Sequence, residues 1–202
     1  MDGPAPHAAV IGAVTLLERS INYLLGNLQL VRPELLDRPT PCTDWDLREL
    51  LWHVNDGLDT LSPGPLTTED PIHAVRDGAR RALGSWVSSR SADSIWIDDV
   101  HVSPAIVATA GAIEIAGHGW DIARACGWRR PVPPGLADEL LELLPVFVTS
   151  DDRRSHFGPP VEMPACACAG DRLIGLMGRR PPGPVERRYL QSRAALLLAN
   201  SR

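Results

Sequence analysis

The stretch SPAIVATAGAIEIAGHGWDIARAC, residues 103–126, decides the fold. Pro104 directly after Ser103 is typical of the first turn of a helix, where the missing N–H of proline has no partner to lose. Small and apolar residues then follow almost without interruption from 105 to 116. A helix with this composition is apolar around most of its surface, so the stretch predicts a helix that is buried on most sides.

Outward from this stretch, apolar residues recur at steps of three and four residues, which is the spacing of amphipathic helices. A Thr-x-x-Asp pair, Thr43 and Asp46, imitates a capping box ahead of one of them. Ile95–Ile97 reads as a short extended piece. The predicted helices span residues 8–31, about 45–61, about 71–86, 103–126 and 136–148. Without an internal repeat, they predict an all-α domain built as a helix bundle.

The C-terminal part has a different composition. Residues 155–169 are rich in Pro, Gly and Cys and read as an irregular segment, which is followed by a short helix at 171–177. Residues 179–184 resemble a linker, and 185–199 form an amphipathic helical tail. We therefore expect a helical bundle over residues 1–150 and a C-terminal extension over 151–202 that packs on the bundle.

Composition excludes several classes of function. Hydrophobic residues make up 44% and charged residues 22% of the chain, as in ordinary globular proteins. The net charge of -5 offers no basic face for a nucleic acid. The start lacks a secretory signal and no apolar run has the length of a membrane span, so we expect a cytoplasmic protein without a membrane partner. The four cysteines lack paired spacing, which predicts free thiols.

Three polar side chains within residues 103–126 share one helical face. Glu114, His118 and Asp121 follow one another at steps of four and three residues. His53 lies at the edge of the apolar stripe of the second predicted helix and points inward. Two helices of this kind can bring His53, Glu114 and His118 together as three ligands of a divalent metal, with a position left open. Asp121 is then either a further ligand or the acceptor for the imidazole N–H that the metal does not use, and the second role is favoured.

Simpler interpretations stay open for each of these residues. A lone buried histidine is more often a hydrogen-bonded core residue than a ligand, and a Glu-x-x-x-His pair is common on solvated helices. Trp45 and Trp120 flank the candidate ligands in sequence, where they pack in the core or line a pocket. Arg124 either holds a carboxylate of a bound molecule or pairs with a surface acid. Cys42 is expected to pack at the start of a helix.

Two separated motifs resemble a known family. The run TPCTDWDLR at 40–48 with His53-Val54, then Glu114 with HGWDIAR at 118–124, resembles the actinobacterial branch of the DinB-like metal-binding proteins. This branch is related to mycothiol-dependent maleylpyruvate isomerase. FGPPV at 157–161 is similar to the closing segment of its small members. The resemblance covers about residues 8 to 180.

The resemblance implies a four-helix bundle with a metal, often zinc, held by His53, Glu114 and His118. It also implies mycothiol or a similar low-molecular-weight thiol as cosubstrate, activated for addition or transfer to a small electrophile, or for its isomerisation. Asp121 would be a supporting catalytic residue, and Trp45, Trp120 and Arg124 would bind the thiol. Nickel, iron or manganese suit the same ligands. Related bundles often pair, so a homodimer is an open expectation.

One departure limits the assignment. Maleylpyruvate isomerase carries an additional C-terminal domain, and the stretch after Thr149 is too short for it, so its substrate is not carried over. The alternatives are a non-catalytic metal-binding module, an enzyme of a biosynthetic pathway that uses the same cavity on another substrate, and a metal-free scaffold.

Overall fold

The computed structural model describes residues 6–42, 45–88, 95–97, 100–148 and 157–181. Two three-residue strands and one isolated β-bridge are the only β structure among these residues, so the predicted all-α class is confirmed. The elements in chain order are α1 (Pro6–Leu28), the 3-10 helix η1 (Pro33–Leu35), α2 (Leu47–Leu61), α3 (Pro71–Ser88), β1 (Ile95–Ile97), β2 (Val100–Val102), α4 (Pro104–Ala125), α5 (Pro134–Phe147) and α7 (Ala169–Leu176).

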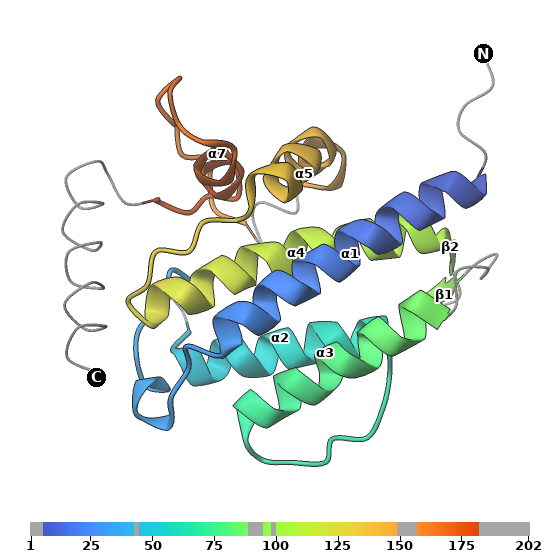
Figure 1. The fold of residues 1–202 in the computed structure, drawn as a ribbon, viewed down its shortest axis with the longest axis horizontal. Helices are drawn as coiled ribbons and strands as arrows, with labels where there is room; N and C mark the ends of the chain where they lie inside the picture. Colours follow the sequence, from blue (N-terminus) through green and yellow to red (C-terminus); the bar gives the residue numbers. More distant parts are fainter. Residues whose placement is uncertain (1–5, 43–44, 89–94, 98–99, 149–156, 182–202) are drawn as a thin grey trace.

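Helices α1 to α4 form the bundle (Figure 1). α1 and α4 lie side by side, α2 packs against α3 and α4, and α5 and α7 lie together on the other side of the α1–α4 pair. β1 and β2 form a small antiparallel hairpin between α3 and α4, with Trp96 opposite His101. The largest side chains with almost no exposed surface are Leu17, Ile21, Leu24, Leu28, Leu47, Leu50, Leu51, Leu58, Ile113, Ile122, Leu136 and Leu140.

The closest approach between α1 and α4 depends on a glycine. A Cβ atom at Gly119 would lie 3.0 Å from Cδ1 of Tyr23 and 3.4 Å from Cα of Leu24, so a larger residue would push the helices apart. Beside it, the buried Asn27 amide donates a hydrogen bond of 2.9 Å to the Gly119 carbonyl oxygen. This contact fixes α1 against the part of α4 that carries His118.

Helix α1 is long and strongly apolar. Residues 8–28 have a mean hydropathy of 1.3 and the length to cross a membrane, the one such helix among the described residues. This differs from the expectation that no stretch would qualify. Its apolar side packs against α4 and α3, as the core helix of a bundle does. Of the apolar stretch, 39% is buried within the described structure.

The start of α2 differs from the prediction. The helix begins at Leu47, and its cap is Asp46, whose carboxylate accepts a hydrogen bond of 2.9 Å from the Glu49 N–H. The Glu49 carboxylate in turn accepts 2.9 Å from the Asp46 N–H, which completes a capping box. The predicted cap, Thr43, lies outside the described residues. Asp46 forms a β-bridge with Pro39, so the chain is extended there and the helix begins only afterwards.

The end of α1 is also earlier than predicted. The helix ends at Leu28, and the N–H groups of Leu30 and Val31 bond to the carbonyls of Asn27 and Leu28 in a turn. Apolar residues at 30 and 31 continue the helical spacing in sequence while packing as part of this turn. The pattern alone therefore overestimates the helix by three residues.

The C-terminal extension is partly described. Its helix α7, predicted at 171–177, packs on α5 and begins two residues earlier, at Ala169. The interpretation of 179–184 as a linker is wrong at its first residue, because Arg179 is buried and bonded to α4. The predicted tail at 185–199 lies outside the described residues. The division at residue 150 stays a prediction.

Candidate metal centre

The centre of the site is His118, which projects from α4 and is 6% exposed. Its Nδ1 lies 3.1 Å from Oδ2 of Asp121, and its Nε2 lies 3.3 Å from Oε2 of Glu114. The three residues share one face of α4, as their spacing predicts. With Nδ1–H donating to Asp121, Nε2 is the ring nitrogen on the Glu114 side and would be the one to bind a metal, as in metal-bound histidines.

His53 reaches the same place from α2. Its ring centroid lies 5.0 Å from that of His118, with the rings nearly perpendicular. One ligand atom each from His53, Glu114 and His118 lie within 4.8 Å of one another. Metal–ligand bonds of about 2.0–2.2 Å put neighbouring ligand atoms about 3.3–3.6 Å apart in a tetrahedron. The 3.3 Å between His118 and Glu114 has this value, and the three residues form a group that could hold a metal ion.

The site has a solvent side and a protein side. The Glu114 side chain is 44% exposed and His53 is partly buried, whereas Asp121 has no exposed surface. A small molecule can therefore approach from the side of Glu114. The opposite side of the imidazole is closed by protein.

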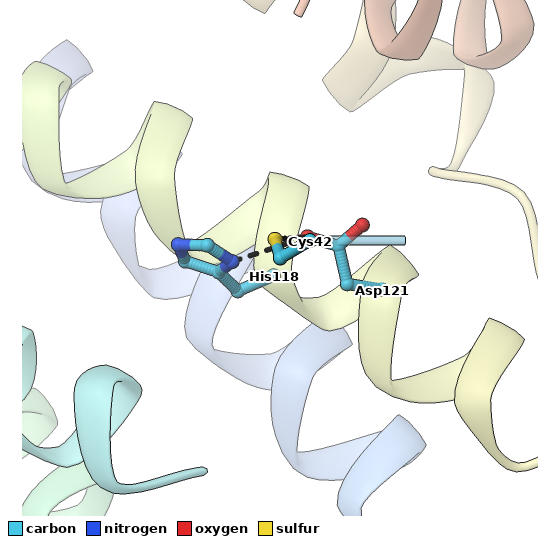
Figure 2. A group of neighbouring side chains, drawn as sticks. All are labelled: Cys42, His118 and Asp121. Atoms are coloured by element: carbon cyan, nitrogen blue, oxygen red, sulfur yellow. Dashed lines mark hydrogen bonds and ion pairs between the residues drawn. The ribbon is translucent and has the colours of Figure 1, made fainter. Parts of the chain in front are cut away.

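A second group of ligand types shares His118. Cys42, His118 and Asp121 also bring ligand atoms within 4.8 Å, and Figure 2 shows one ring nitrogen of His118 turned toward the other two side chains. The Cys42 thiol lies 3.4 Å from Oδ2 of Asp121. However, Nη2 of Arg179 lies 2.8 Å from the same oxygen and 3.7 Å from the Cys42 sulfur. A cation is already present here, so a metal ion is better placed beside His53 and Glu114.

Arg179 and Cys42 are the two site residues that sequence reasoning missed. Asp121 within an apolar helix signals that some counter-charge must compensate it. No spacing rule identifies which of the many arginines supplies that charge, because Arg179 is 58 positions away. Cys42 was expected to pack at the helix start, and its contact with Asp121 adds a thiol to the protein side of the site.

The charges around His118 favour a cation. Burial lowers the pKa of His118, but hydrogen bonds with Asp121, Cys42 and Glu114 outweigh this and hold the pKa well above 6.5. Burial likewise raises the pKa of Asp121, but the charge of Arg179 and the hydrogen bonds from His118 and Arg179 bring it to about 2. Burial opposes ionisation of Glu114 too, and the hydrogen bond and charge of His118 leave its pKa below the usual range. Both carboxylates are therefore anionic at neutral pH.

The Asp121 carboxylate also stabilises the charged form of Arg179. Burial lowers the pKa of Arg179, while the charge of Asp121 and the hydrogen bonds to it raise the pKa above its ordinary value. The guanidinium is therefore a permanent positive charge behind the site. Asp121 is shared between this fixed cation and the imidazole of His118.

The three residues expected to bind a thiol lie in two places. Trp45 is at the site, with its ring centroid 4.3 Å from that of His53 and 6.4 Å from that of His118. Trp120 is buried in the hydrophobic core, and the guanidinium carbon of Arg124 lies 5.9 Å from its ring centroid. Two positions along a helix is about 200°, so Trp120 leaves α4 on the side opposite His118. The structure brings Trp45 to the candidate ligands, whereas Trp120 packs in the core.

Comparison with known proteins relates the first part of the chain to one family. Residues 17–64 match the family model described as mycothiol maleylpyruvate isomerase N-terminal domain. The match runs from α1 through α2 and thus includes His53. No curated protein and no solved structure matches the chain. The resemblance of the chain to the mycothiol maleylpyruvate isomerase N-terminal domain family is therefore confirmed over residues 17–64.

Proposed function

We propose that the protein binds one divalent metal through His53, Glu114 and His118 and acts on a low-molecular-weight thiol such as mycothiol. The reaction is addition or transfer of the thiol to a small electrophile, or isomerisation of that electrophile. One observation carries the proposal: three ligand atoms from two helices converge within 4.8 Å on a side of the bundle where Glu114 is exposed. The family match over residues 17–64 supports the thiol.

Each residue has a part in this proposal. His53, Glu114 and His118 hold the ion, and Asp121 keeps the imidazole of His118 oriented by accepting a hydrogen bond from its Nδ1–H. The metal supplies a positive charge that lowers the pKa of a coordinated thiol enough to ionise it near neutral pH. Trp45 covers His53 and offers an apolar wall for the bound molecule. Zinc is the expected metal, and nickel, iron and manganese accept the same ligand set.

Elemental analysis of protein purified without chelator tests the metal site. We expect about one equivalent of metal in the unaltered protein and little in His53→Ala. The matched control is His73→Ala, because His73 is an exposed histidine of α3 whose Nδ1 lies 2.7 Å from the carboxylate of Asp70. Full metal content in His53→Ala would refute the ligand assignment.

A thiol titration tests the second half of the proposal. After replacement of the native metal by cobalt, the visible spectrum reports on the ligands of the ion. Addition of mycothiol should shift the spectrum if its sulfur joins them, and S-alkylated mycothiol, which has no free thiol, should not. An unchanged spectrum with full cobalt occupancy would instead identify a metal-binding module without thiol chemistry.

A further inference from the structure

The end of α7 is built to hold Arg179 in one position. The Arg179 N–H bonds to the Ile174 carbonyl at 3.1 Å and the Gly178 N–H bonds to that of Gly175 at 3.0 Å, which is the Schellman pattern of a helix end. Gly178 has a φ of +81°, and a Cβ atom there would lie 2.6 Å from the backbone of Gly158. Only glycine fits this turn, and the turn directs Arg179 back toward α4.

Arg179 binds Asp121 through two nitrogens. Its Nε lies 2.9 Å from Oδ1 of Asp121 and its Nη2 lies 2.8 Å from Oδ2. Its Nη1 donates 3.2 Å to the carbonyl of Met177, so the guanidinium is also tied to its own segment. Both side chains are buried, with exposures of 8% and 0%. A bidentate pair of this kind fixes the plane of the carboxylate as well as its position.

The fixed carboxylate oxygen is the one that orients the imidazole. Oδ2 of Asp121 accepts from both Nη2 of Arg179 and Nδ1 of His118. Through these two bonds the segment after α7 determines where Nε2 of His118 points, which is toward Glu114. A buried ion pair is weak evidence for stability by itself, since desolvation offsets much of its attraction. Because the Arg179–Asp121 pair contacts His118, a candidate ligand, it can also orient that ligand.

We propose that Arg179 is a positioning residue for the metal centre, acting through Asp121 on His118. Docking of residues 157–181 and metal binding then favour each other, because linkage makes the coupling reciprocal. This inference rests on the metal site proposed above. It adds that the C-terminal extension is part of that site, although it supplies none of the ligands.

A double-mutant cycle on zinc affinity tests the path from Arg179 through Asp121. Zinc dissociation constants are measured by competition with a chromophoric chelator for the unaltered protein, Arg179→Gln, Asp121→Asn and the double variant. Loss of an outer partner of a metal ligand weakens binding by about 10- to 100-fold, so we expect about tenfold for each single variant. In the Asp121→Asn background, Arg179→Gln should cost less than about twofold more.

Two features keep the cycle interpretable. The double variant removes both buried charges together, so it avoids the uncompensated charge that could unfold a single variant. Arg172→Gln is the matched control, since Arg172 belongs to α7 and makes a long surface ion pair, 3.9 Å, with Asp138. Its zinc affinity should stay within about twofold of the unaltered protein.

The outcomes separate the inference from the function on which it rests. Unchanged zinc affinity in a folded Arg179→Gln, tighter binding in that variant, or losses that multiply in the double variant would each overturn the positioning role. Failure of the unaltered protein to bind zinc or any of the alternative metals would overturn the metal site and the inference together.

Hydrogen exchange provides a second test, because an ion pair that only stabilised the fold would not change the effect of zinc on amide exchange. Zinc should slow amide exchange in residues 169–181 of the unaltered protein. In Arg179→Gln the same segment should exchange equally fast with and without zinc. Equal protection by zinc in both proteins would contradict the coupling.

Discussion

Trp45 and His53 stack with ring centroids 4.3 Å apart and ring planes inclined by 35°. Trp45 precedes the first turn of α2 and His53 lies in its middle, so the tryptophan folds back along the helix. One face of the His53 imidazole lies against the Trp45 ring, and the His118 ring lies nearly perpendicular to that imidazole. The geometry of the candidate ligand is therefore set by the segment that leads into its helix.

Trp45→Ala should weaken zinc binding through His53. A stacked aromatic pair contributes about 1 kcal/mol beyond burial, so we expect about a fivefold rise in the zinc dissociation constant. Trp45→Phe keeps a ring against the imidazole and should stay near the unaltered value. Equal losses in the two variants would show that something other than the stacked ring holds His53.

Most of the fold follows from local sequence signals. α4 begins at Pro104 and ends at Ala125, within a residue of what the Ser-Pro start and the apolar run predict. Ile95–Ile97 is extended as expected. The errors occur where longer-range contacts compete with the local pattern, as at α2, where the bridge between Pro39 and Asp46 delays the helix.

The candidate site likewise has a part that the local sequence pattern predicts and a part that depends on contacts between distant segments. Glu114, His118 and Asp121 share a face because helical spacing requires it, and the spacing alone predicts their grouping. The meeting of His53 with them depends on how α2 packs on α4, which the sequence suggests only through an inward position. The ion pair of Arg179 with Asp121 depends on a helix end in a different part of the chain, and no local pattern reports it.

Gly119→Ala should destabilise the bundle. The added Cβ would lie 3.0 Å from the Tyr23 ring and 3.4 Å from the backbone of Leu24, and the backbone cannot move away alone. Overpacking of this kind costs about 1–3 kcal/mol, which urea unfolding followed by circular dichroism can measure.

The matched control for this variant is Gly57→Ala in α2. An added Cβ there meets nothing within 4 Å, and alanine is the better helix former. We expect Gly57→Ala to stabilise the protein by about 0.5–1 kcal/mol. A similar loss of stability in both variants would rule out the close approach of α1 and α4 as the cause.

Asp46→Ala should destabilise the start of α2. The substitution removes the carboxylate that accepts the Glu49 N–H, while the Glu49 carboxylate can still accept from the backbone N–H of residue 46. Loss of such a cap costs about 1 kcal/mol. Asp46→Asn keeps a cap and should lose only a part of this, while Asp37→Ala, which breaks an exposed pair with Arg48, should change little. Urea midpoints of the three variants in this order would support the capping box, and any other order would contradict it.

The cysteines should differ sharply in reactivity. Cys166 and Cys168 are exposed, whereas Cys126 is buried, and burial raises its pKa to about 11 despite the nearby charge of Arg38. Because the thiolate is the reactive form, about one Cys126 in a thousand is reactive at pH 8 even before access is considered. Iodoacetamide labelling followed by peptide mass spectrometry should modify Cys166 and Cys168 first and Cys126 only after unfolding in urea.

The raised pKa of Cys126 also predicts a pH dependence of stability. The folded protein keeps the thiol proton up to about pH 11, whereas the unfolded chain releases it near the ordinary value of 9.0. Between these values the unfolded state binds fewer protons, so stability falls as the pH rises through this window. Cys126→Ala removes the group and should flatten this part of the profile, measured as urea midpoints from pH 8 to 10.5 under reducing conditions. If the slope of stability against pH is the same in both proteins, the loss of stability at alkaline pH comes from other groups, because Cys126→Ala has no thiol at this position to ionise on unfolding.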